Sequence, residues 1–342
     1  MAIFLFSPSK EIRFGKFDSC RFIRTFYETK RNGVVSGYIR TVLYVLFPLL
    51  TGSFLKRVKR LRPFTIPLFN QLENMIMCVI LPLTVLVSVA RYSLSELMGG
   101  LAAMAMALLA VGGCFLFSTG ISFLAGFGRE RTVGVVLNSS FMNVGHLGLP
   151  LVYALLGTEY LLPASFYAVA VAVLNLVMGV YMLSSLSNGG KHPLNYFIGF
   201  PPLLALLFAM VFVGAGATLP EEVWGFFDDY LAGPFFLLML LFAGYCLELV
   251  SPTKYKEELL LIGVARFLFS PAITIFAMMM MDLSFTHDLS PKPSLLLSIM
   301  PPAAFNLLLA HTYKSERDLY GAAVMFLTLF SLFFLLPLLF FL

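Results

Sequence analysis

The sequence predicts an all-α polytopic membrane protein, with ten transmembrane helices arranged as two inverted five-helix repeats. Of its 342 residues, 59% are hydrophobic and 12% are charged, and the mean hydropathy is +0.90. Soluble proteins, by contrast, carry about 25% charged residues. Apolar stretches recur that, at about 18 residues or more, are long enough to cross a hydrocarbon core about 30 Å thick. Basic residues also gather in alternate loops between these stretches.

The first segment, residues 1–37, is expected to be a basic N-terminal tail, because seven Lys and Arg residues precede Tyr38. The order of its residues is not that of a secretory signal peptide. Its centre, Phe22–Tyr27 (F-I-R-T-F-Y), predicts either a basic amphipathic helix on the membrane surface or an unstructured tail.

The rest of the chain divides at charge clusters, Gly and Pro residues and polar runs into ten hydrophobic segments. The first five-helix repeat is expected at residues 38–186 and the second, inverted one at 194–342, joined by a short cytoplasmic linker at 187–193. The expected spans are about 38–55, 64–90, 95–125, 132–157, 161–186, 194–217, 230–250, 257–281, 293–313 and 318–342.

The loops predict the orientation of these spans. Connections from odd to even spans hold twelve basic residues, whereas the opposite connections hold only Arg91 and Lys292. By the positive-inside rule the twelve-residue side is cytoplasmic, so both termini of a ten-span protein are non-cytoplasmic. The basic N-terminal tail disagrees with this placement. We expect a multi-pass protein of the cell (plasma) membrane, and basic residues spread over short loops do not indicate a nucleic-acid partner.

Two of the expected spans contain polar, helix-breaking residues at corresponding places. The fourth span of the first repeat carries N-V-G-H-L-G-L-P at Asn143–Pro150, and the fourth span of the second carries M-P-P-A-A-F-N at Met300–Asn306. Proline costs about 3 kcal/mol inside a helix and glycine about 1 kcal/mol. Paired interrupted segments are the best sequence pointer to a transport site.

The chemistry expected at these breaks is anion binding. Half-helices beginning near Pro150 and near Pro301 or Pro302 would direct free N–H groups and positive dipole ends at a ligand. Asn143 and Asn306 add amide groups that donate to a carboxylate or accept from a hydroxyl or indole N–H. The alternative is that Gly and Pro are merely common in membrane helices and that the asparagines join helices to each other.

These residues carry a family resemblance. The stretch N-V-G-H-L-G-L-P-L-V-Y-A-L-L-G (Asn143–Gly157) resembles the N-x-G-x-x-G-L-P motif of the auxin efflux carrier family, which contains plant PIN carriers and many prokaryotic transporters. Met300–Asp318 resembles the second crossover of that family, and Gly52–Arg57 and Ile80–Leu83 resemble its first two spans. The resemblance covers about residues 38–342. It departs at His146, where the family more usually has an aromatic or aliphatic residue, and at the N-terminal extension.

The resemblance implies the ten-span, inverted-repeat fold of the bile-acid sodium symporters, with the fourth and ninth spans crossing at the substrate site. It also implies an elevator-type motion against a scaffold of spans one, two, six and seven, a homodimer, and small organic-anion substrates such as malonate, malate, lactate or an auxin-like acid. The candidate substrate-binding residues are then Asn143, Gly145, His146, Pro150, Pro301, Pro302 and Asn306.

Ionisable residues inside the spans are candidate charge partners or coupling groups. Arg266 is expected either to neutralise a substrate carboxylate, to bind carbonyl groups at a helix break, or to pair with Glu73 or Glu248. Glu73 and Glu248 are candidates for coupling to H⁺ or Na⁺, or they reach to the membrane interface. His146 is a candidate for carrying a coupled proton or contacting substrate, and a hydrogen-bonded structural histidine is an equal alternative.

The function expected is secondary transport of a small organic anion, with no cofactor and no bound metal. The first alternative is a sodium-coupled symporter in which the crossover asparagines bind sodium, and a more remote one is a membrane receptor or scaffold. A membrane-embedded enzyme is disfavoured because no aspartate lies in the interior of an expected span and the chain has no H-E-x-x-H or G-x-S-x-G motif.

Overall fold

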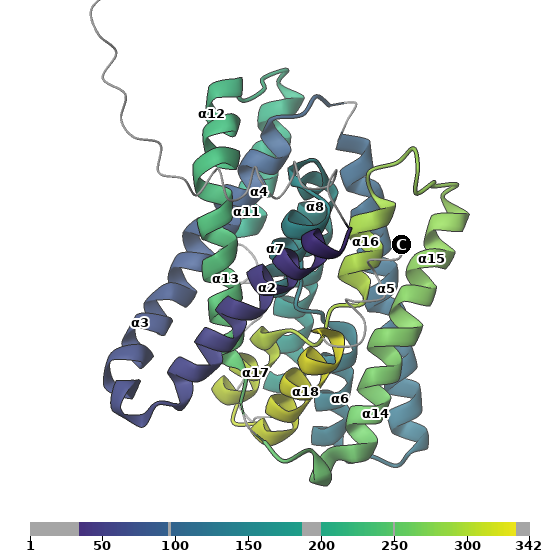
Figure 1. Ribbon diagram of the computed structural model, residues 1–342. Coiled ribbons are helices and arrows are strands. Elements are labelled where there is room, and N and C mark those ends of the chain that lie inside the picture. The colour runs from purple at the N-terminus through teal and green to yellow at the C-terminus, as the bar shows by residue number, and fades with distance from the viewer. Residues whose placement is uncertain (1–33, 95–96, 187–199, 249, 333–342) are drawn as a thin grey trace, which may run out of the picture.

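The computed structural model describes residues 34–94, 97–186, 200–248 and 250–332 (Figure 1). The predicted linker at 187–193 and the amphipathic stretch Phe22–Tyr27 lie outside the described residues. The first described helix begins at Val34, so only the end of the predicted tail is described.

The first half of the described chain contains α2 (Val34–Arg57), η2 (Lys59–Leu61), α3 (Arg62–Met75), η3 (Ile76–Ile80), α4 (Leu81–Ala90), α5 (Leu97–Leu124), α6 (Arg129–Ser140), η4 (Val144–Gly148), α7 (Leu149–Leu155), η5 (Thr158–Tyr160), α8 (Leu161–Leu174), η6 (Asn175–Gly179) and α9 (Val180–Ser184). The second half contains α11 (Pro201–Gly214), α12 (Glu221–Phe226), η7 (Phe227–Leu231), α13 (Ala232–Cys246), η8 (Pro252–Tyr255), α14 (Lys256–Val264), η9 (Ala265–Phe269), α15 (Ser270–Met280), α16 (Pro291–Ser298), α17 (Ala304–Thr312) and α18 (Arg317–Phe330).

The regular elements of the described chain are all helices and it contains no strand, which confirms the helical class of the prediction. Five continuous helices in it are long and apolar enough to cross a membrane, as expected of a polytopic membrane protein. They are Lys59–Ala90, Gly100–Leu124, Thr158–Ser184, Glu221–Cys246 and Pro252–Met280. The count of ten spans and the inverted repeat stay predictions.

Three of these long helices, and the shorter helix Val144–Leu155, contain a π turn followed closely by proline. Pro82, Pro150 and Pro271 each stand at the second position of the α-helix that follows a π turn, and Pro234 stands at the third. Proline has no N–H and its ring collides with the preceding turn of an α-helix. A wider π turn relieves that collision, so these prolines are accommodated without ending the helix.

Pro150 therefore does not mark the start of a half-helix, which corrects the prediction. The break in the fourth expected span comes earlier, after Ser140, and the helix resumes at Val144 and continues through Pro150 to Leu155. The second break lies where the sequence indicated, between Ser298 and Ala304.

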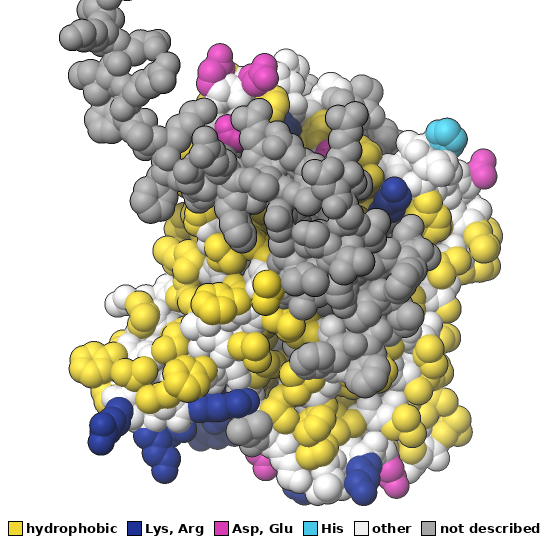
Figure 2. Space-filling model, viewed as in Figure 1, with side chains coloured by type: hydrophobic (Ala, Val, Ile, Leu, Met, Phe, Trp, Pro, Cys, Tyr) yellow, Lys and Arg dark blue, Asp and Glu magenta, His cyan; other side chains and the backbone are white. Residues whose placement is uncertain are grey.

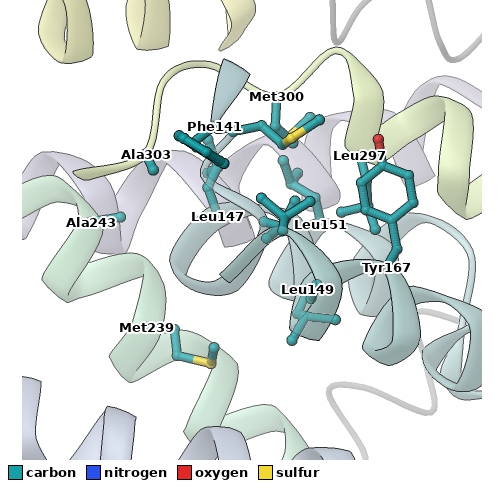
Figure 3. Packing of buried hydrophobic residues seen from close by; sticks show 14 of the residues in the cluster. Phe141, Leu147, Leu149, Leu151, Tyr167, Met239, Ala243, Leu297, Met300 and Ala303 are labelled. Carbon is teal, nitrogen blue, oxygen red and sulfur yellow. The ribbon is translucent and has the colours of Figure 1, made fainter. Parts of the chain in front are cut away.

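The two breaks cross each other and pair through their backbones. Met142 and Pro302 form an isolated antiparallel bridge. The N–H of Asn143 donates to the carbonyl of Pro301 at 2.8 Å, and the N–H of Ala303 donates to the carbonyl of Phe141 at 2.9 Å. Buried apolar side chains, among them Leu147, Leu297 and Met300, surround the crossing (Figure 3). In Figure 1, α6 lies below α7 while α16 lies above α17, so the broken helices run in opposite directions.

Helices α2 and α13 pack with their backbones in close contact through two glycines. A Cβ at Gly52 would lie 2.0 Å from the carbonyl oxygen of Leu241, and a Cβ at Gly244 would lie 2.0 Å from that of Leu49. No other residue type fits at these positions without moving a backbone. Small residues are the usual means by which membrane helices approach this closely.

The surface separates charge by end. In Figure 2 the lower end carries most of the visible Lys and Arg side chains, below a broad hydrophobic band, and Asp and Glu gather at the upper end. Arg57, Lys59, Arg60 and Arg62, in the turn between α2 and α3, are exposed at the basic end. The band and its charged borders have the pattern of a protein surface in contact with lipid.

Candidate functional site

Two cavities lie beside the crossing of the broken helices. The inner cavity has a volume of about 70 Å³ and is lined by the end of the first break and the start of the resumed helix, including Asn143, Gly145 and His146, and by apolar residues of α4 and α8. The polar cavity has a volume of about 230 Å³ and is lined by the following polar and charged residues: Lys56, Asn70, Glu73, His146, Glu248, His311 and Arg317.

The cavities share a wall of three residues. Met77, His146 and Phe305 line both of them. These residues come from the π turn η3, the π turn η4 and the first turn of α17. The two cavities are therefore adjacent, with these three residues between them.

The inner cavity meets the start of the half-helix formed by η4 and α7. The first amides of a helix have no acceptor inside it. Among the described residues no acceptor lies against the N–H groups of Gly145 and His146, whereas the N–H of Val144 finds the carbonyl of Met142 at 2.9 Å. Free amides and a positive dipole end at a cavity wall favour a negatively charged ligand.

Two asparagines bring amide groups to the inner cavity. Asn143 was predicted as a site residue, and its side chain lines the cavity while remaining 4% exposed. Asn175, in the π turn η6, also lines it and was not predicted. Its side-chain oxygen is buried and meets no hydrogen-bond donor in the described part of the chain. A lone asparagine in the apolar run A-V-L-N-L-V was the signal that would have found it.

His146 is buried between the two cavities. Its ring lies 4.9 Å from that of Phe242, centroid to centroid, and its Nε2 has no hydrogen-bond partner among the described residues. The geometry thus places His146 where it would touch a ligand in either cavity.

The remaining predicted residues of the crossover line neither cavity. Asn306 donates through Nδ2 to the carbonyl of Leu137 at 3.0 Å and to Oδ1 of Asn138 at 3.4 Å, so it ties the start of α17 to the end of α6. Pro301 and Pro302 belong to the backbone bridge. Pro150 is buried inside the resumed helix.

Arg266 adopts one of its three expected arrangements, because it binds carbonyl groups at the helix breaks. Nη1 donates to the carbonyls of Ser139 at 3.0 Å and Ser140 at 3.3 Å, and Nη2 donates to the carbonyl of Ser298 and to Oγ of Ser270, both at 2.6 Å. The side chain is fully buried. It lines neither cavity and is not paired with Glu73 or Glu248.

Glu73 and Glu248 both line the polar cavity, but their surroundings differ. Glu248 accepts from Lys56 at 3.1 Å and from Arg317 at 2.6 Å. Burial raises the pKa of the Glu248 carboxyl, but the Lys56 charge and the hydrogen bonds from Arg317 and Lys56 outweigh it and hold the pKa below its ordinary value. Glu73 forms no ion pair with a described residue.

The sequence was compared with known proteins. No protein-family model matches the chain. An uncharacterized transporter of Methanothermobacter thermautotrophicus is 27% identical over 304 residues, which cover 87% of this chain and 96% of that protein. An uncharacterized transporter of Methanocaldococcus jannaschii is 26% identical over 304 residues, which cover 85% of this chain and 94% of that protein.

The resemblance to the auxin efflux carrier family stays a prediction. What the two archaeal relatives support is a membrane protein with a role in transport, because the similarity extends over nearly the whole of both proteins.

Proposed function

We propose that this protein is a secondary transporter that moves a small organic anion across the membrane by an elevator-type alternating-access mechanism. The observation that carries the proposal is the inner cavity, where the amides of Gly145 and His146 and the side chain of Asn143 meet at the start of a half-helix. Such an arrangement binds a carboxylate through N–H groups and a helix dipole, with no need for a basic side chain.

The lining of the inner cavity favours a ligand with two unlike ends. Its polar residues Asn143, His146 and Asn175 are few, and apolar side chains such as Leu81 and Val85 make up most of the wall. A carboxylate would bind to the amides, and an apolar carbon skeleton would contact Leu81 and Val85. The small volume favours short organic acids over bulky ones.

The proposed motion needs a rigid scaffold and a unit that moves against it. The glycine contacts between α2 and α13 support a rigid scaffold, since the two backbones touch. The crossed breaks support a second unit, because two backbone hydrogen bonds join them. We further propose the ten-span inverted repeat, a homodimer in the plasma membrane, and non-cytoplasmic termini with the basic end facing the cytoplasm.

The experiment is uptake into proteoliposomes containing the purified protein, with radiolabelled malonate, malate, lactate and indole-3-acetate as probes. With the acid that is transported, Asn143→Ala should raise KM at least about tenfold, because a hydrogen bond to a charged group contributes roughly 1.5–3 kcal/mol. The matched control is Asn74→Ala, which removes an exposed amide on α3 that lines neither cavity. Transport of no probe by the wild type, or unchanged KM and rate in Asn143→Ala, would refute the proposal.

A further inference from the structure

The C-terminal ends of two half-helices, α6 and α16, meet behind the crossing. The last carbonyl groups of a helix have no donor inside it, and they carry the negative end of the helix dipole. The carbonyls of Ser139 and Ser140 from α6 and of Ser298 from α16 converge on one point. Two negative dipole ends brought together in a buried place require a positive charge between them.

Arg266 supplies that charge. Four hydrogen bonds, from 2.6 to 3.3 Å, join its guanidinium to the three carbonyls and to Oγ of Ser270. Ser270 in turn donates to the carbonyl of Ser298 at 2.9 Å. The guanidinium is fully buried and forms no ion pair with a carboxylate of the described chain, so the three helix-end carbonyls and Oγ of Ser270 compensate its charge.

The same oxygen atoms are a donor set for a small cation. In transporters built from broken helices, carbonyls at the C-terminal ends of half-helices and in unwound backbone coordinate a coupling ion such as Na⁺. Here three such carbonyls and one hydroxyl oxygen, from three segments of the chain, surround the Arg266 guanidinium. Unlike a bound ion, a guanidinium stays charged and cannot dissociate from the protein.

We infer that Arg266 is a tethered cation that occupies, in this protein, a site where a dissociable monovalent cation would otherwise bind. The consequence for transport rests on the function proposed above: flux does not depend on Na⁺, because the site is permanently filled. A second consequence does not rest on it. Shortening Arg266 should open a site for a free cation in the folded protein.

The test measures thermal unfolding of the purified protein, without substrate, in matched NaCl, KCl and choline chloride and with guanidinium chloride at low millimolar concentration. The wild type should have the same Tm in the first three salts. Arg266→Ala should unfold at lower temperature in choline chloride and should regain roughly 2–4 °C with a small cation, Na⁺ or guanidinium. Arg266→Lys keeps a tethered cation, and its Tm should be indifferent to the choice of salt.

The matched control is Arg60→Ala, which removes an exposed cation of the basic end that forms no ion pair with a described carboxylate, and it should show the wild-type pattern. Stabilisation of the wild type by Na⁺ over choline would overturn the inference, as would folded Arg266→Ala that no cation stabilises. If Arg266→Ala does not fold, the inference is tested by the wild type and Arg266→Lys, and a Tm of either protein that depends on the choice of salt would overturn it. Failure of every probe acid to be transported would refute the proposed function and leave this measurement standing.

Discussion

A methyl group added at Gly145 should separate a role in binding from a role in folding. An ideal Cβ at Gly145 would lie 3.6 Å from the nearest neighbouring atom, Cδ1 of Leu81, which is an ordinary van der Waals contact. Gly145 and Leu81 both line the inner cavity, so the methyl group would occupy cavity space beside the free amides. Gly145→Ala should therefore fold normally and bind substrate poorly.

Gly148, one turn further along, gives the contrasting case. A Cβ there would lie 2.5 Å from Cδ2 of Leu297 and 3.4 Å from the carbonyl oxygen of Asn143. Leu297 is fully buried and has little room to move. Overpacking of this kind costs about 1–3 kcal/mol, so Gly148→Ala should lower Tm by several degrees.

The assay combines Tm by thermal unfolding with KM for uptake in proteoliposomes. We expect Gly145→Ala to keep Tm within about 2 °C of the wild type and to raise KM roughly tenfold, which corresponds to about 1.4 kcal/mol and is the scale of one lost hydrogen bond. Gly148→Ala should lower Tm and leave KM of the folded fraction nearly unchanged. Wild-type KM in a fully folded Gly145→Ala protein would refute the assignment of the inner cavity as the substrate site.

Three further predictions follow from other contacts. Gly244→Ala forces a Cβ to within 2.0 Å of the carbonyl oxygen of Leu49 and should greatly reduce the yield of folded protein. The control Gly112→Ala, at a position with open space around it, should leave the yield unchanged. Equal yields of the two variants would contradict the contact between α2 and α13. Asn306→Leu should lower stability by about 1–3 kcal/mol through the lost bond to Leu137 while leaving KM unchanged, and a change in KM at constant Tm would instead assign Asn306 to the substrate site. Because the pKa of Glu248 is lowered in the folded protein, its ion pairs stabilise the fold at pH values above the ordinary pKa of about 4.5, and this stabilisation is lost as pH falls through the lowered pKa. The Tm of Glu248→Gln should therefore fall less than the Tm of the wild type over that acidic range. Parallel curves of Tm against pH for the two proteins would exclude the effect.

The helical segments could be predicted from the sequence because long apolar runs and basic loops are strong signals. The two crossing breaks were also predictable, since Asn143 and Met300–Asn306 interrupt those runs. The start of the first resumed helix could not be predicted in this way. Pro150 indicated a helix start near itself, but the preceding π turn accommodates its ring, and the helix resumes at Val144. A π turn has no distinct sequence signal, so proline alone cannot distinguish a break from a bulge.

The roles of individual polar residues depended on contacts between distant parts of the chain. Arg266 had three open alternatives, and the choice among them required the positions of Ser139 and Ser298, which are far away in sequence. Asn306 was expected at the substrate site, but its amide is directed at the end of α6. Asn175 was overlooked because a single asparagine in an apolar span often serves only to join helices.

The bridge between Met142 and Pro302 is made of main-chain atoms. The hydrogen bonds beside it, from Asn143 to Pro301 and from Ala303 to Phe141, also use only N–H and carbonyl groups. Replacement of a side chain at the crossing therefore leaves the joint itself in place, provided that no proline removes an N–H. Under the transport mechanism proposed above, substitutions in the cavity lining would change the substrate and leave these main-chain hydrogen bonds unaltered.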